Sequence, residues 1–169
     1  MPQHLSKKQI KYFKDLDLFL TKQNSKDLVD HFPLFLRREY LIYYLTKYEL
    51  VKKILNVKGS IVECGVWKGS SLMLIAKLMS IFEPYGIHRK IIGFDTFKGF
   101  LGTNPLDIAK DKSVNKKIYK KGFKGDTSLD LINKCISFYD LNRPNGHLNK
   151  IELVKGNAIK TIPQYIKKN

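Results

Sequence analysis

Cysteine and histidine are scarce in this sequence of 169 residues. The two cysteines, Cys64 and Cys135, lie far apart without CxxC spacing, and the four histidines are scattered along the chain. This distribution argues against a disulfide framework and against a zinc site. We therefore expect both cysteines to be reduced and buried.

Long apolar runs are also missing. No uncharged apolar run reaches the ~18 residues that indicate a membrane-spanning helix. The first residues include acidic side chains and lack the apolar core of a secretory leader. We therefore expect a cytoplasmic protein that has no membrane partner.

Acidic residues are few beside basic ones, 15 against 31, which gives a formal net charge of +16. A strongly basic surface is typical of proteins that bind nucleic acid. Here the excess is almost all lysine, and no aromatic-basic motif of the RNA-binding kind accompanies it. Such lysines would neutralise phosphates, but nothing in the sequence would read a base. A nucleic-acid-binding domain is therefore the weakest of the functional hypotheses below.

The apolar pattern divides the chain into two regions, 1–56 and 57–169. In the first region, apolar residues recur at helical spacing from Ile10 to Leu20 and again from Leu41 to Leu55, with Pro33 separating the two runs. We expect this region to be helical. The hydrophobic content of 43% is enough for one ordinary core.

After Gly59 the pattern changes to alternating strands and helices. Short apolar runs predict strands over 60–64, 90–95 and 151–154, and helical periodicity predicts helices over 70–82, from about 127 onwards, and over 158–168. This order indicates an α/β fold with a parallel sheet, right-handed crossovers and helices on both faces. The lysine-rich segment between 96 and 126 is expected to be a mobile loop.

One stretch, IVECGVWKGSS over residues 61–71, predicts a ligand site. Glu63, Gly65 and Gly69 would lie at the carboxyl end of the first strand, where ligands bind in such sheets. Gly65 would allow close approach to the backbone, and Gly69 would let the helix begin near the strand. The amides around Ser70 and Ser71 would present unpaired donors at the helix start.

The residues around these glycines favour a cationic nucleoside. Asp95, at the end of the next strand, can accept hydrogen bonds from both hydroxyls of a ribose. The dinucleotide pattern G-x-G-x-x-G lacks its middle glycine here, and Trp67 stands where a pyrophosphate would need room. Glu63 would repel a dianion, but it suits the ammonium and sulfonium groups of S-adenosylmethionine.

Three segments carry a resemblance to a known family. The runs YELVKKILNVKGSIVECGVWKGSSLMLIAKL, EPYGIHRKIIGFDTFKGF and KGNAIKTIPQYI resemble the macrocin-type sugar O-methyltransferases, a class I S-adenosylmethionine-dependent family. The resemblance covers roughly Tyr48 to the last residue. It implies a Rossmann-like methyltransferase fold and methyl transfer to a hydroxyl of a sugar or glycosylated metabolite, often with magnesium.

The resemblance also implies roles for individual residues. Glu63, Gly65 and Gly69 would surround the methionine part of the cofactor, Asp95 the ribose, and Asn157 the adenine. The family usually has aspartate at the last of these positions. Thr96 and Phe97 would form the neighbouring wall. We also expect Val66, Trp67, Ser70 and Ser71 to line the cofactor site, with the alternative that Trp67 only covers the edge of the sheet.

The chain departs from the family at its end. Only three strands are predicted, whereas the family continues into a fourth strand with acidic metal ligands and three more. In the expected order 3-2-1-4-5, the missing fourth strand would leave an edge of the first strand exposed. We expect a partial fold from a truncated gene, or a second chain that supplies the rest, and we assign no catalytic residue and no metal ligand. We also expect this chain to be oligomeric or prone to aggregate.

Three functional hypotheses remain open. The first is the cofactor-binding half of an S-adenosylmethionine-dependent O-methyltransferase. The second is a non-catalytic truncated nucleoside-binding module or subunit. The third is a basic nucleic-acid-binding domain.

Overall fold

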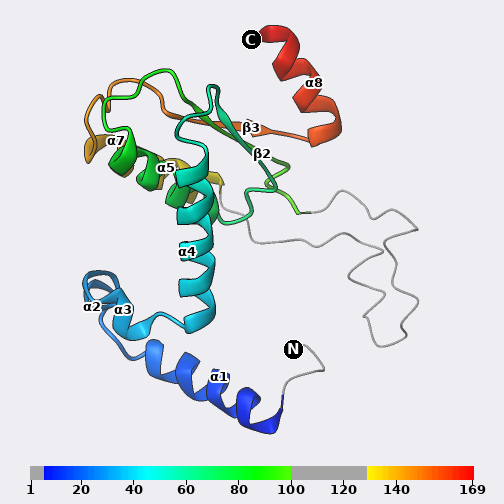
Figure 1. Cartoon of the computed structure of the whole chain (residues 1–169). Helices are drawn as coiled ribbons and strands as arrows, with labels where there is room; N and C mark the ends of the chain where they lie inside the picture. Colours follow the sequence, from blue (N-terminus) through cyan, green and yellow to red (C-terminus); the bar gives the residue numbers. More distant parts are fainter. Residues whose placement is uncertain (1–5, 100–128) are drawn as a thin grey trace. The chain divides into compact units, whose positions relative to one another are not determined.

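The computed structural model describes residues 6–99 and 129–169 (Figure 1). The chain divides into two compact units, 1–45 and 46–169. The first unit contains α1 (Lys7–Leu20), α2 (Ser25–Asp30) and α3 (Phe32–Phe35), and α4 (Arg38–Lys53) crosses the boundary in sequence. Most of the lysine-rich segment that we expected to be a mobile loop lies outside the described residues.

Two helices of the first unit, α1 and α2, begin at residues whose side chains cap them. The Ser6 hydroxyl accepts from the Gln9 amide at 3.3 Å and the Gln9 side chain accepts from the Ser6 amide at 2.9 Å, which is a capping box at the start of α1. The Asn24 side chain caps α2. Pro33 lies in sequence between α1 and α4, as the prediction that it separates two helical runs requires. It lies in the first turn of α3, where its missing N–H costs no hydrogen bond.

The second unit is built on a parallel sheet of β1 (Ile61–Cys64), β2 (Ile91–Asp95) and β3 (Ile151–Lys155), in the order β1-β2-β3. Ile61, Ile91 and Ile151 lie opposite one another across the sheet. All three predicted strands are confirmed. The order places β1 at an edge of the sheet, as the methyltransferase order predicts.

One face of the sheet carries the hydrophobic core. It is covered by α5 (Ser70–Phe82) and α7 (Leu129–Leu141), which lie on the same side of the sheet in Figure 1. The helix predicted over 70–82 is confirmed as α5, and most of its apolar residues face the core. The core residues that these two helices supply are Leu72, Ile75, Ala76, Leu78, Met79, Ile132 and Tyr139.

The opposite face of the sheet carries α8 (Ala158–Lys168). The rings of Phe94 and Tyr165 meet edge to face with centroids 5.5 Å apart, and the Tyr165 hydroxyl donates to Glu152 at 2.9 Å. These contacts hold α8 against β2 and β3. On the same face of β1, Val62 is 54% exposed.

The prediction that both cysteines are buried is wrong, because Cys64 and Cys135 are both exposed. Cys64 shares the face of β1 that carries Val62, which α8 leaves open. Cys135 lies on the outer side of α7. Strand and helix periodicity placed these residues in elements but did not show which face each element buries.

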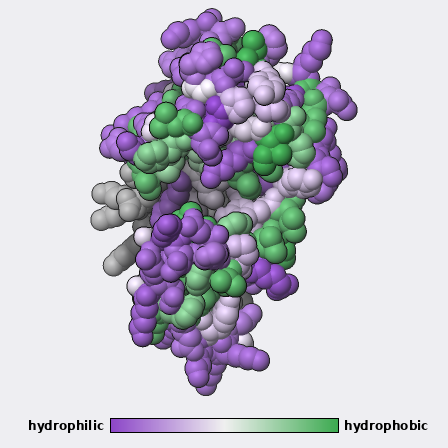
Figure 2. Space-filling model, turned by 90° about the vertical axis from the view of Figure 1, so that its left-hand side faces the viewer, coloured by the Kyte–Doolittle hydropathy of each residue, from purple (hydrophilic) through white to green (hydrophobic). Residues whose placement is uncertain are grey.

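Hydrophobic side chains reach the surface in several separate patches between polar residues, as Figure 2 shows for one side of the molecule. Within the described residues, no helix is both long enough and apolar enough to cross a membrane.

Candidate functional site

The loops that follow the three strands all leave the sheet at the same end, which is formed by the carboxyl ends of the strands. Because the strands are parallel, their carboxyl ends point the same way. The Gly65 amide donates to the Phe94 carbonyl at 2.8 Å, and the Gly156 amide donates to the Asp95 carbonyl at 2.9 Å. The backbone at these strand ends is therefore held in register by hydrogen bonds.

Asp95 organises this end of the sheet with its side chain. Its Oδ2 accepts from the Trp67 amide at 2.9 Å, and its Oδ1 accepts from the Phe97 amide at 2.7 Å. Hydrogen bonds to a carboxylate are among the stronger ones in proteins. Each oxygen has two lone pairs, so each can accept a second donor from a ligand.

Glu63 lies on the same face of the sheet as Asp95. It pairs in register with Gly93, two residues before Asp95, and residues two apart in a strand share a face. The Oε2 atom of Glu63 is buried and has no hydrogen-bond partner among the described residues. A buried polar atom without a partner is costly, so this oxygen is suited to a donor that arrives with a ligand.

The loop after β1 contains three residues of positive φ, namely Gly65, Trp67 and Gly69. Gly65 has φ +86°, and a Cβ placed on it would meet no atom within 4 Å. Open space therefore borders the backbone at this point. Trp67 has φ 51°, and the residue is 57% exposed. The hydrogen bond from its amide to Asp95 holds this uncommon conformation.

The start of α5 requires a glycine. Gly69 adopts the left-handed conformation with φ +79°, and a Cβ there would lie 3.0 Å from the Ile132 side chain. The helix can therefore begin directly after the loop and pack against α7. Ser70 and Ser71 form its first turn, and the Ser71 hydroxyl is buried without a hydrogen-bond partner among the described residues.

Two of the predicted cofactor-binding residues, Val66 and Phe97, belong to the core. Val66 and Phe97 are only 4% and 6% exposed, so a ligand could contact them only through their backbone atoms. Thr96 bridges the turn after β2: its hydroxyl donates to the Gly99 carbonyl at 2.5 Å and accepts from the Lys98 amide at 3.1 Å.

Asn157 has a structural role in addition to the one that the resemblance implies. Its Oδ1 accepts from the Ile159 amide at 3.0 Å and caps α8. The carbonyl oxygen keeps one further lone pair. An asparagine directly before an amphipathic helix is a signal for this cap that we had not used.

Gly93 is a site residue that the sequence analysis missed. A Cβ on this residue would lie 2.7 Å from the Val66 side chain. Because glycine has no Cβ, the loop after β1 can pack onto the sheet. A glycine inside an apolar strand is a known sign of such close approach.

A separate cavity of about 440 Å³ lies at the other end of the sheet, lined by Leu55, Gly59, Glu83, His88 and Arg89 among others. The Arg89 guanidinium is already engaged with Glu83 and with backbone carbonyls of residues 54–59. We assign no ligand to this cavity.

No group of three or more histidine, cysteine, aspartate and glutamate side chains that could hold a metal occurs within 6–99 and 129–169. The magnesium that the resemblance implied therefore has no such group of ligands in this part of the chain.

Comparison with solved structures shows the methyltransferase fold. A crystal structure of CalS11, a calicheamicin methyltransferase, matches with 29% identity and a TM-score of 0.85 over 98% of this chain and 64% of that chain. An apo structure of CalS11, described as a TDP-rhamnose 3'-O-methyltransferase of calicheamicin biosynthesis, matches with 27% identity and a TM-score of 0.75, over 98% and 63%. The O-methyltransferase NovP shares the fold at 18% identity and a TM-score of 0.52, over 72% of this chain and 47% of that one.

This chain therefore spans less than two thirds of the length of the CalS11 chains that it matches. Comparison with curated proteins gave no match. The model of the macrocin O-methyltransferase (TylF) family matches residues 48–168. That match covers most of the chain, and the protein belongs to this family.

Proposed function

We propose that this chain is the cofactor-binding part of an S-adenosylmethionine-dependent O-methyltransferase that acts on a hydroxyl of a sugar or glycosylated metabolite. The family match and the methyltransferase activity of CalS11 support the reaction class. The observation that carries the proposal is the buried Oε2 of Glu63, which has no partner in the described residues and lies on the sheet face that Asp95 shares.

Glu63 and Asp95 suit opposite parts of the cofactor. S-adenosylmethionine supplies a methyl group on a positively charged sulfur, and it also carries an ammonium group. The ammonium N–H groups match the unpartnered carboxylate oxygen of Glu63. The remaining lone pairs of Asp95 suit the two hydroxyls of a ribose, because its carboxylate is already oriented by the Trp67 and Phe97 amides.

The surrounding backbone completes the proposed cofactor site. The open space at Gly65 lets a ligand lie against the loop, and the first turn of α5 at Ser70 and Ser71 presents unpaired amides. The exposed indole of Trp67 offers an apolar wall, and the second lone pair of the Asn157 carbonyl can accept from an adenine amino group.

Calorimetry with two ligands tests the roles of these carboxylates. We expect Glu63→Gln to weaken binding of S-adenosylhomocysteine by about 10-fold or more, because a charged hydrogen bond contributes ~1.5–3 kcal/mol. The same variant should leave adenosine binding unchanged, since adenosine has no ammonium group. Glu49→Gln, at an exposed position on α4, is the matched control. Equal losses for both ligands, or no loss for either, would contradict the assignment of Glu63.

A nucleoside-binding module without activity is the second candidate, because the chain spans less than two thirds of the CalS11 length. Both candidates bind S-adenosylhomocysteine, so methyl transfer from labelled S-adenosylmethionine to a nucleotide-linked deoxysugar separates them. Product formed by this chain alone supports the enzyme. Cofactor binding without product supports the module.

The net charge of +16 keeps a nucleic-acid-binding domain as a third candidate. DNA affinity that falls steeply with salt and differs between sequences would favour it over the methyltransferase. We expect only weak binding without sequence preference.

A further inference from the structure

Residues 6–45 of the first unit form no hydrophobic core of their own. Between residues 6 and 45 no side chain is buried. Burial of apolar surface is the main favourable term in folding, so a unit that leaves this much apolar surface in water needs a cover. The exposed large hydrophobic residues of the unit include Tyr12, Leu18, Phe19, Val29, Phe32, Leu34, Tyr40, Leu41 and Leu45.

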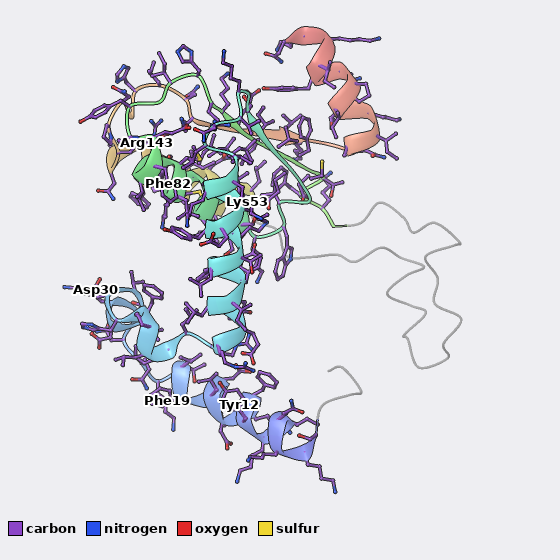
Figure 3. The ribbon with its side chains drawn as sticks, in the orientation of Figure 1. Tyr12, Phe19, Asp30, Lys53, Phe82 and Arg143 are labelled. Atoms are coloured by element: carbon purple, nitrogen blue, oxygen red, sulfur yellow. The ribbon has the colours of Figure 1, made fainter. Side chains whose placement is uncertain are left out.

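One exposed stripe on α1 has the spacing of a helix-pairing seam. Lys8, Tyr12, Asp15 and Phe19 follow one another at intervals of four, three and four residues, which places them in one row along the helix. Tyr12 and Phe19 are 49% and 51% exposed, and both are labelled on α1 in Figure 3. Lys8 and Asp15 are exposed as well. The half-buried apolar residues of α1 form a different row of the helix, which points away from this stripe: Ile10, Phe13, Leu16 and Leu20.

The charges of α1 indicate the direction of its partner. Lysines occupy positions 7, 8, 11 and 14, and aspartates occupy positions 15 and 17. The first turn contains no acidic residue and the last turn no basic one, so this order does not favour the isolated helix dipole. The same order of charges is complementary to a second copy of the helix that runs in the opposite direction, because the basic half of each copy then faces the acidic half of the other.

We propose that α1 pairs antiparallel with α1 of a second copy of this chain about a two-fold axis at Tyr12. With a rise of ~1.5 Å per residue, Lys8 lies ~6 Å along the helix from Tyr12, and Asp15 lies ~4.5 Å away on the other side. Antiparallel pairing therefore brings Lys8 to within ~1.5 Å of the height of Asp15 of the partner subunit. Two such pairs flank the two tyrosine rings, which is the self-complementary arrangement of a two-fold dimer.

The dimer should be weak. α1 has 14 residues and is therefore about 21 Å long, which is short for the ~1,200 Å² of a standard stable interface. The net charge of +16 on each copy also opposes association. At ~0.15 M salt the Debye length is about 8 Å, so distant charges are screened while contacting pairs are not.

Charge reversal tests the pairing by sedimentation of the whole chain over a range of concentrations. We expect Lys8→Glu and Asp15→Lys each to weaken dimerisation by about 10-fold or more, because each places like charges opposite one another twice. The double variant Lys8→Glu with Asp15→Lys should restore the dimer. Lys14→Glu makes the same charge change on another side of α1 and is the matched control.

Three results would overturn the proposal. One is a monomer at every concentration, which would mean that other parts of the same chain cover the stripe. Another is a dimer that neither single reversal affects. The third is a double variant that fails to recover association while circular dichroism shows unchanged helix content. Hydrogen exchange at Tyr12 that slows as protein concentration rises would support the pairing.

Discussion

The amide of Trp67 donates a hydrogen bond to the carboxylate of Asp95 across 2.9 Å, although the two residues are 28 positions apart. Asp95 ends β2, and Trp67 lies in the loop that leaves β1. The bond therefore ties the loop after one strand to the end of its neighbour. It positions the same carboxylate that we propose as the ribose acceptor, so the stability of this loop and ligand binding depend on one side chain.

We expect Asp95→Ala to destabilise the protein, because both the Trp67 and Phe97 amides lose their acceptor. Each lost charged hydrogen bond is worth about 1.5–3 kcal/mol. Asp95→Asn keeps one carbonyl oxygen and should cost about half as much. Urea unfolding of the two variants measures the difference. Equal stability of the alanine variant and the parent protein would show that the loop does not need this acceptor.

We expect Arg89 to be the main stabilising residue at the end of the sheet opposite the proposed cofactor site. Its side chain is 10% exposed, contacts Glu83 at 3.2 Å, and donates to the carbonyls of Gly59 and Val57 at 3.0 and 2.7 Å. We expect Arg89→Ala to cost about 3 kcal/mol, because a partly buried carboxylate and several carbonyls lose their donor. Arg89→Lys should recover only part of this, since an ammonium lacks the planar fork.

Arg38→Ala is the control for Arg89→Ala in the same unfolding experiment. Its side chain is 80% exposed and lies 3.9 Å from Glu39. Such exposed pairs contribute about 0–1 kcal/mol. Similar losses for the two arginine variants would contradict a specific role for Arg89.

We expect the buried phenol of Tyr139 to make the protein less stable at alkaline pH. Burial raises the pKa of its phenol above the ordinary value, an effect that its hydrogen bond with Ser80 partly offsets, and its hydroxyl donates to the Ala76 carbonyl at 2.9 Å. The unfolded chain therefore loses this proton first, at about pH 10. Below that pH the protonated phenol contributes fully to the stability of the folded protein. This contribution should be lost as the pH rises through the pKa of Tyr139 in the folded state.

Unfolding of Tyr139→Phe and the parent protein between neutral and alkaline pH isolates this effect. The difference in unfolding free energy between the two should shrink as pH rises past about 10, because all other titrating groups are shared. A difference that stays constant or grows would show that ionisation of Tyr139 does not limit alkaline stability.

The cysteines should react without denaturant. Cys64 and Cys135 are both exposed, so a thiol-reactive chromophore should label two groups per chain in the native protein. Cys64→Ser should leave one. Labelling that requires denaturant would show that both thiols are buried, as the sequence had led us to expect.

Element positions in the second unit were largely predictable from local patterns. The β-branched run before Cys64 and the helical spacing of Leu72, Ile75 and Met79 lie in a strand and a helix as expected. The first unit shows a limit, because local patterns did not predict the short helix α3 that has Pro33 in its first turn. Asn157 shows another, since one side chain can cap a helix and face a ligand.

By itself, the sequence determined the alternation of strands and helices, the family, and the placement of carboxylates at neighbouring strand ends, because each of these depends on residue spacing along the chain. Only the tertiary structure decided that the Asp95 carboxylate holds the loop at Trp67, that Glu63 keeps a buried oxygen without a partner in the described residues, and that Cys64 is exposed. These depend on which faces of the sheet are covered and on which amides lie across the strand ends. Such contacts join residues distant in sequence, and local periodicity carries no information about them.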